Sequence, residues 1–146
     1  MALHWLVLVV TAMALGIVSE QSQRAETLAW HGDVSAISYN LLVYRQALAT
    51  YAQSNPTLTG NVVDSALPLP SWFVHLPGVE GLVAAGLSYT YYPQPPAGLA
   101  RKLADLTQGS VAAGLNIQGR LVNPDTGVTL ILLPAAVPEG AVVLYQ

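Results

Sequence analysis

Residues 30–56 read WHGDVSAISYNLLVYRQALATYAQSNP, and this stretch decides the fold. Its large apolar side chains recur in alternating steps of four and three residues: Trp30, Val34, Ile37, Leu41, Tyr44, Leu48 and Tyr51. Residues three and four apart share one helix face, so this spacing predicts a helix with a single apolar seam. Asp33 is a suitable N-cap, and Pro56 disfavours helix at the residue before it. We predict a helix over residues 33–54, with continuation from upstream through Thr27 as an alternative.

An apolar run precedes this helix. Residues 3–18 read LHWLVLVVTAMALGIV, and together with the first two residues they approach the roughly 17 that a membrane-spanning helix needs. We therefore expect residues 1–18 to be a transmembrane signal anchor, followed by a polar stalk and the amphipathic helix at residues 19–55. One alternative is a secretory signal cleaved at Ala12-Met13-Ala14, which the lack of Lys or Arg before the run disfavours. The other is a buried core helix.

The apolar seam has two interpretations. It can pack on a sheet of the same chain, or it can pair with another membrane-anchored helix and form a homo-oligomer. Paired helices usually carry opposite charges beside the seam, whereas Arg45 is the only charged residue between Val34 and Ala52. The first interpretation is favoured. For the second, the candidate partner-binding residues are Ile37, Leu41, Tyr44, Leu48 and Tyr51.

The composition excludes several classes of function. Of 146 residues, 53% are hydrophobic and 9% are charged, whereas a soluble domain carries about 25% charged residues. This favours a membrane segment or a large buried interface. A net charge of −3 gives no basic surface field, so we expect no nucleic-acid partner. The absence of cysteine excludes disulfides, thiolate metal sites and cysteine nucleophiles.

Residues 56–146 form a different region, in which Pro and Gly separate short apolar runs in the manner of strands and turns. The predicted strands are Asn61–Ser65, Leu87–Tyr92, Val111–Ile117, Arg120–Val122, Thr129–Leu132 and Ala141–Leu144. The turn sequence Asn123-Pro124-Asp125-Thr126-Gly127 should join two of them in a hairpin, and leucines at helical spacing predict a short helix at 98–107. The predicted fold class is α+β: a transmembrane helix, an amphipathic helix, and a small antiparallel β-rich domain with one short helix.

Residues 67–73 read LPLPSWF and are expected to be extended, because Pro68 and Pro70 lack a backbone donor. This segment is either a loop that covers the core, with Trp72 filling it, or an exposed docking strip for a partner. In the second case Pro70, Trp72 and Phe73 are candidate partner-binding residues.

No motif for catalysis is present. The histidines His4, His31 and His75 lack the spacing of metal ligands, and neither a GxSxG elbow nor a phosphate-binding GxxxxGK[ST] loop occurs. The eight acidic residues are scattered along the chain. We therefore expect no enzyme activity, no cofactor and no metal.

A series of short motifs runs through the chain. It comprises Tyr44-Arg45-Gln46-Ala47, Asn55-Pro56, Leu67-x-Leu69-Pro70-x-Trp72-Phe73, Gly86-x-x-Tyr89-x-Tyr91, Gly119-Arg120-Leu121, Asn123-Pro124, Leu133-Pro134 and Val137-Pro138-x-Gly140-Ala141-Val142-Val143. In this order the motifs resemble the PilM family of small type IV pilus biogenesis proteins, which accompany the thin pili of conjugative plasmids. The chain does not resemble the longer, actin-like pilus protein of the same name.

The resemblance implies a non-enzymatic protein of the bacterial inner membrane with a periplasmic C-terminal domain. Such a protein acts in pilus assembly or the basal body, and so in conjugative mating. Its implied partners are pilins or other pilus-machine proteins, and the inner membrane. A minor pilin-like filament subunit is an alternative, although Gly16 and Glu20 follow the apolar run where a processed pilin has them before and within it. A secreted cell-envelope binding module is another.

Overall fold

The structure is a computed structural model that describes the backbone of residues 2–146 and the side chains of residues 28–146. The chain divides into two compact units, Met1–Asp33 and Val34–Gln146. Helix α1 (Ala2–Ser54) passes through Gly32-Asp33, so the predicted start at residue 33 is wrong and Asp33 is not an N-cap, whereas the predicted end before Pro56 is confirmed. Among residues 28–146 no helix is both long and apolar enough to cross a membrane. The predicted anchor, residues 1–18, lies outside those residues.

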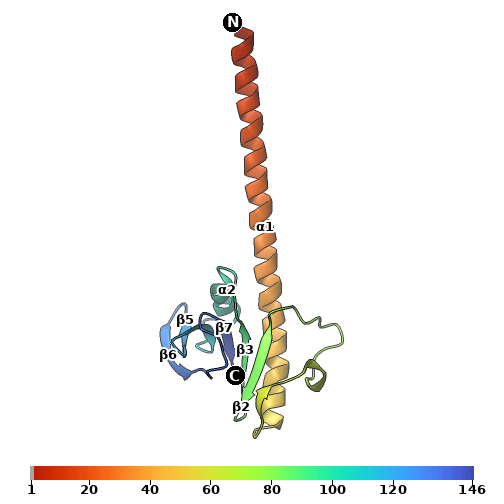
Figure 1. Cartoon of the computed structure of the whole chain (residues 1–146), viewed down its shortest axis with the longest axis vertical. Helices are drawn as coiled ribbons and strands as arrows, with labels where there is room; N and C mark the ends of the chain where they lie inside the picture. Colours follow the sequence, from red (N-terminus) through yellow and green to blue (C-terminus); the bar gives the residue numbers. More distant parts are fainter. Residues whose placement is uncertain (1) are drawn as a thin grey trace. The chain divides into compact units, whose positions relative to one another are not determined.

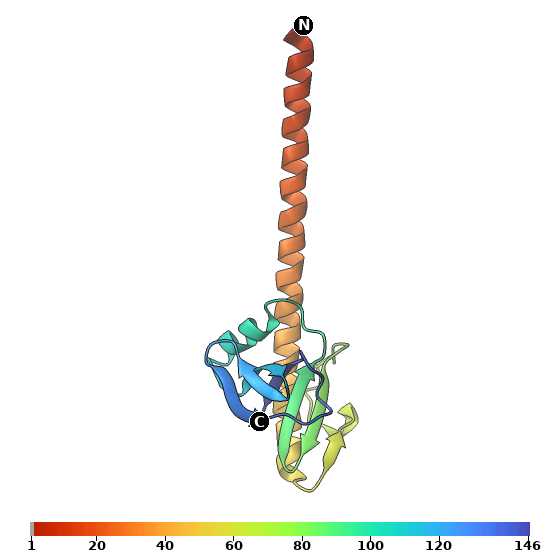
Figure 2. The ribbon, with the colours of Figure 1, turned by 60° about the vertical axis from the view of Figure 1, so that its left-hand side comes forward.

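The second unit is built on one antiparallel seven-stranded sheet (Figure 1, Figure 2). The strands are β1 (Thr59–Asn61), β2 (Glu80–Ala84), β3 (Leu87–Tyr92), β4 (Ala113–Ile117), β5 (Arg120–Asn123), β6 (Gly127–Leu132) and β7 (Val142–Tyr145). Their order is β1-β2-β3-β7-β4-β5-β6. The last strand of the chain therefore lies in the middle of the sheet. Helix α2 (Leu99–Leu106) connects β3 to β4.

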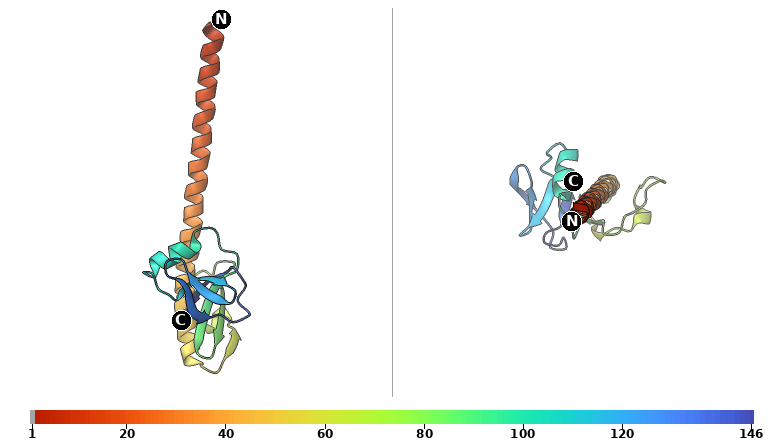
Figure 3. Two further views of the ribbon diagram at one scale, coloured as in Figure 1. Left: turned by 90° about the vertical axis from the view of Figure 1, so that its left-hand side faces the viewer. Right: turned by 90° about the horizontal axis from the view of Figure 1, so that it is seen from above.

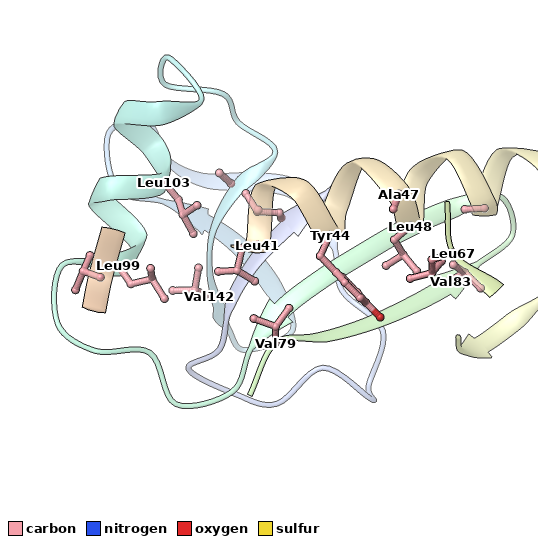
Figure 4. Close-up of a cluster of buried hydrophobic side chains, with 14 residues drawn as sticks. Leu41, Tyr44, Ala47, Leu48, Leu67, Val79, Val83, Leu99, Leu103 and Val142 are labelled. Carbon is pink, nitrogen blue, oxygen red and sulfur yellow. The ribbon is translucent and has the colours of Figure 1, made fainter. Parts of the chain in front are cut away.

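One face of the sheet packs on α1 and α2. Leu41, Tyr44 and Leu48 are at most 2% exposed, and they point from α1 toward the strands (Figure 4). Leu99 and Leu103 of α2 belong to the same cluster and are completely buried. Burying a Leu side chain contributes about 1.5–3 kcal/mol, so this face is a main source of stability. Gly81 allows the close packing of α1, because a Cβ there would lie 2.6 Å from the Tyr44 ring.

The other face of the sheet carries a second, smaller core. Successive strand residues point to opposite faces, so Val142 and Leu144 of β7 join the helix-side cluster while Val143 joins the second one. Tyr89 and Tyr91 of β3 lie on this second face with Val143. The segment after β6 covers it, because Leu133, Val137 and Ala141 belong to the same cluster. Strand β7 is thus buried on both faces, which explains its continuous apolar sequence.

Most predicted strands are present with shifted ends. The range Leu87–Tyr92 is confirmed as β3, the hairpin of β5 and β6 forms around the predicted turn, and α2 lies within residues 98–107. The predicted strand Asn61–Ser65 is wrong. Its first residue ends β1, and Asp64–Ala66 form a 3-10 helix. Strand β2 is not predicted, because Gly81 and neighbouring glycines at 78 and 86 resemble a loop sequence.

Candidate functional site

The predicted seam residues of α1 lie in the core of their own unit. Leu41, Tyr44 and Leu48 belong to the helix-side cluster, and Ile37 and Tyr51 are half-buried against it. The seam therefore packs on the sheet of the same chain. The three buried residues are not free to contact a second helix, so a homo-oligomer through the seam would require this core to open.

The strip at residues 67–73 has a buried side and an exposed side. Leu67 is 8% exposed, and Phe73 packs partly against the same core as α1. Trp72 is 70% exposed, so the expectation that it fills the core is wrong. Leu67 and Phe73 hold the strip instead, and Trp72 is left in solvent, as the docking-strip interpretation requires.

Trp72 forms one wall of an open groove. Its other lining residues are Leu42, Val43, Gln46, Ala47 and Thr50 of α1 together with Pro68 and Pro70. The groove has a volume of about 480 Å³, and none of its lining residues is charged. The segment between β1 and β2 lies on the side of α1 away from β4, β5 and β6 (Figure 3). The groove therefore lies on the part of α1 that the sheet leaves uncovered.

The polar atoms of the groove are few. The Thr50 hydroxyl donates to the carbonyl oxygen of Gln46 at 2.9 Å, so it is already engaged with the helix backbone. Pro68 and Pro70 offer no backbone donor. What remains is an apolar surface around one exposed indole, which has the size and polarity to bind one or two large apolar side chains of another protein.

A set of hydrogen bonds holds the strip against α1. His75 Nδ1 lies 2.5 Å from Asp64 Oδ2, and His75 Nε2 lies 2.7 Å from the carbonyl oxygen of Val79. Asn40 of α1 donates to the carbonyl oxygen of Val74 at 2.7 Å and accepts from the amide of Leu76 at 3.3 Å. The segment that carries Trp72 is thus fixed just after the strip.

Tyr44 extends this network into the core. Its ring centroid lies 4.8 Å from that of His75, and the negative charge of Asp64 acts on its hydroxyl. Burial, aided by the negative charge of Asp64, raises the pKa of Tyr44 to about 12. The tyrosine therefore stays neutral at physiological pH.

The sequence reasoning missed one half of the groove. Leu42 and Val43 lie on α1 outside the seam, and they are apolar residues that the seam pattern does not require. These apolar residues outside the seam are the feature of the sequence that indicates a second contact surface on α1. Of the histidines with described side chains, His75 bonds to Asp64 and to Val79, the residue before β2. Among residues 28–146, no group of three His, Asp or Glu side chains is placed to hold a metal ion.

Comparisons with known proteins agree on one family. A model of the PilM family matches residues 6–145. The solved structure of a pilM protein from Pseudomonas aeruginosa 2192 is 42% identical, and the match covers 77% of this chain and 95% of that one, with a TM-score of 0.49.

A second solved structure, of a protein PilM from Escherichia coli B7A, is 19% identical over 80% of this chain and 93% of that one, with a TM-score of 0.60. It supports the fold alone. No curated protein matches the chain. Because the family model spans nearly the whole sequence, the chain belongs to the PilM family.

Proposed function

We propose that this protein is a non-enzymatic component of type IV pilus biogenesis. In this proposal residues 1–18 anchor it in the bacterial inner membrane, and Val34–Gln146 lies in the periplasm, where it binds a pilin or another pilus-machine protein during assembly. The observation that carries the proposal is the family match over residues 6–145. For thin pili of the conjugative type, the expected consequence is a role in mating.

Two features of the chain support an assembly role. The apolar run at residues 3–18 has nearly the length of a spanning helix and is followed by polar residues. The groove beside Trp72 offers an uncharged apolar surface of a kind that commonly marks protein–protein contacts. An exposed Trp beside prolines is a typical anchor for a partner, since aromatic residues dominate interface energetics.

The test is complementation of a strain that lacks the gene. Thr50→Lys places a charge in the groove without touching the core, because Thr50 is exposed on α1. Its matched control is Ala36→Lys, an exposed site on the same helix that does not line the groove. We expect Thr50→Lys and Trp72→Ala to abolish piliation and liquid mating while the protein level is unchanged. Ala36→Lys should retain both.

The anchor needs a separate measurement. Intact mass of the protein from native membranes, together with carbonate extraction, should give a full-length chain that resists extraction and is absent from sheared pili. A full-length chain inside the filaments would support the filament-subunit alternative. A chain that begins near residue 15 in the soluble fraction would support the secreted module, and either result would contradict the proposal.

A further inference from the structure

Strand β6 is an open edge of the sheet. It is the last strand in the order and pairs only with β5 (Figure 1). Its outer edge therefore presents backbone donors and acceptors that no strand of this sheet satisfies. Natural proteins usually protect such edges with charged residues, proline or a β-bulge. The strand reads GVTLIL over Gly127–Leu132 and contains no charged residue and no proline, although its register with β5 shifts once.

The same strand carries the most exposed large apolar side chain of residues 28–146. Val128 is 70% exposed, Leu130 is 93% exposed and Leu132 is 65% exposed. Alternate residues of a strand point to one face, so these three form a single apolar row. The row lies on the helix side of the sheet, because Val128 pairs with Val122, which pairs with Leu115 of the helix-side core.

The fold does not require this row to be apolar. The strand is held from its other side by Thr129, whose hydroxyl donates to the carbonyl oxygen of Leu121 at 2.7 Å. The same hydroxyl accepts from the amide of Ile131 at 3.2 Å. These bonds lie where the pairing of β5 and β6 shifts register, and they fix the irregular part of the strand. The exposed row therefore points to a contact outside this chain.

We propose that the edge of β6 pairs antiparallel with β6 of a second copy about a twofold axis at Leu130. In this register Leu130 faces Leu130 of the other copy, and Val128 faces Leu132, so every apolar side chain of the row meets an apolar one. The strand carries no charge, so no like charges are brought together. Such a contact is self-complementary, as a twofold interface must be.

The charges beside the strand are balanced at both of its ends. Asp125 lies in the turn before β6, where it also faces Arg101 at 3.5 Å. Arg120 pairs with Leu132 at the other end of the strand and is exposed. Glu139 lies at the same end as Arg120, because its carboxylate accepts from the amide of Gln118 at 3.0 Å. Each end therefore holds both signs of charge, and no excess of one sign opposes the pairing.

The test uses the absence of cysteine from the chain. Directly opposite residues in an antiparallel pair have Cα atoms about 4.5–5.5 Å apart, a separation that a disulfide can bridge. Leu130→Cys in the full-length protein, oxidised in membranes with copper phenanthroline, should give a disulfide-linked dimer as the main product. Val74→Cys is the matched control, because Val74 is about as exposed as Val128 but lies off the edge and does not line the groove.

The register has its own test. Val128→Cys and Leu132→Cys should cross-link poorly when each is expressed alone and efficiently when the two are co-expressed. Leu130→Lys should remove the dimer on native mass spectrometry while the circular dichroism spectrum stays unchanged, since the side chain is almost fully exposed. Leu130→Cys that cross-links no more than Val74→Cys, or that links to a different protein, would overturn the proposal.

Discussion

His75 joins the two ends of the segment that carries Trp72, because its Nδ1 lies 2.5 Å from Oδ2 of Asp64, a residue that precedes the strip. The Nε2 atom faces the carbonyl oxygen of Val79 at 2.7 Å. Both ring nitrogens are therefore engaged, each with an oxygen of a different part of the segment. The groove wall is therefore a loop closed at its base by one side chain.

His75→Phe should loosen this loop without unfolding the unit. Phenylalanine keeps an aromatic ring beside Tyr44 and Phe73 but removes both hydrogen bonds. Because His75 and Asp64 are partly exposed, the cost to stability is about 1 kcal/mol. Hydrogen exchange should become faster for the amides of residues 65–76 and stay unchanged in β7. Equal acceleration in both regions would show that the contact supports the whole core instead.

Alkaline pH should destabilise the fold through Tyr44 and Tyr91. Both side chains are at most 3% exposed. Burial is the first cause that raises the pKa of each to about 12, and Asp64 and Glu80 respectively contribute. Since a tyrosine hydroxyl in the unfolded chain ionises near pH 10, folding favours the neutral phenol. Its stabilising effect is complete below pH 10 and is lost as pH rises through 12.

The measurement is urea unfolding between pH 9 and pH 12, with tyrosinate absorbance recorded in parallel. Each ring should account for about 1–2 kcal/mol of the loss over that range. Tyr44→Phe should reduce the pH dependence above pH 10, whereas Tyr39→Phe, at an exposed ring, should leave it unchanged. An unaltered slope for Tyr44→Phe would contradict the assignment.

The parts of the fold that could be predicted are those in which local signals agree. In β3, three tyrosines and a threonine, all residues that favour strands, lie together, and the turn at Asn123–Gly127 combines Pro early with Gly late. Strand β2 could not be predicted, because Gly81 is present for a tertiary reason: α1 packs over it. Only the position of a helix far away in sequence explains that glycine.

The candidate site was half predictable for a similar reason. The LPLPSWF sequence marks Trp72 as an unusual residue, and proline chemistry indicates an extended segment. Whether Trp72 faces the core depends on which neighbours fill it, and Leu67 and Phe73 do so. The other wall, Leu42 and Val43, belongs to a helix face that only the completed sheet defines as uncovered.

Gly114→Ala should be among the most damaging single substitutions in the sheet. A Cβ at Gly114 would lie 2.3 Å from the carbonyl oxygen of Val122, which is backbone and cannot move aside. We expect a loss of more than about 2 kcal/mol in thermal or urea unfolding. Gly140→Ala is the control, because Gly140 has a positive φ of +78° but no neighbour within 4 Å, so only backbone strain of about 1 kcal/mol applies. Equal losses for the two variants would exclude the steric explanation.

Asn123 should tolerate no change of its amide group. It is 1% exposed, and its Nδ2 donates to the carbonyl oxygens of Ser110 and Ala113 at 2.9 and 2.8 Å. Its Oδ1 accepts from the amides of Asp125 and Thr126 at 2.8 and 3.0 Å. One side chain thus satisfies the turn before β6 and the approach to β4. All of its hydrogen-bonding capacity is used, which the turn sequence alone did not indicate.

Asn123→Asp keeps the shape of the side chain but replaces the NH2 group, which donates, with an oxygen that can only accept. A carboxylate can still accept from the two amides, but it would face two carbonyl oxygens that have lost their donor, in a buried site. We expect a loss of about 3 kcal/mol in urea unfolding, together with faster hydrogen exchange in β5 and β6. Asp125→Asn makes the opposite change two residues away and breaks only an exposed ion pair with Arg101, so it should cost less than about 1 kcal/mol. If the two variants were equally stable, the turn would not depend on the buried amide, and another contact would have to hold the turn before β6 in place.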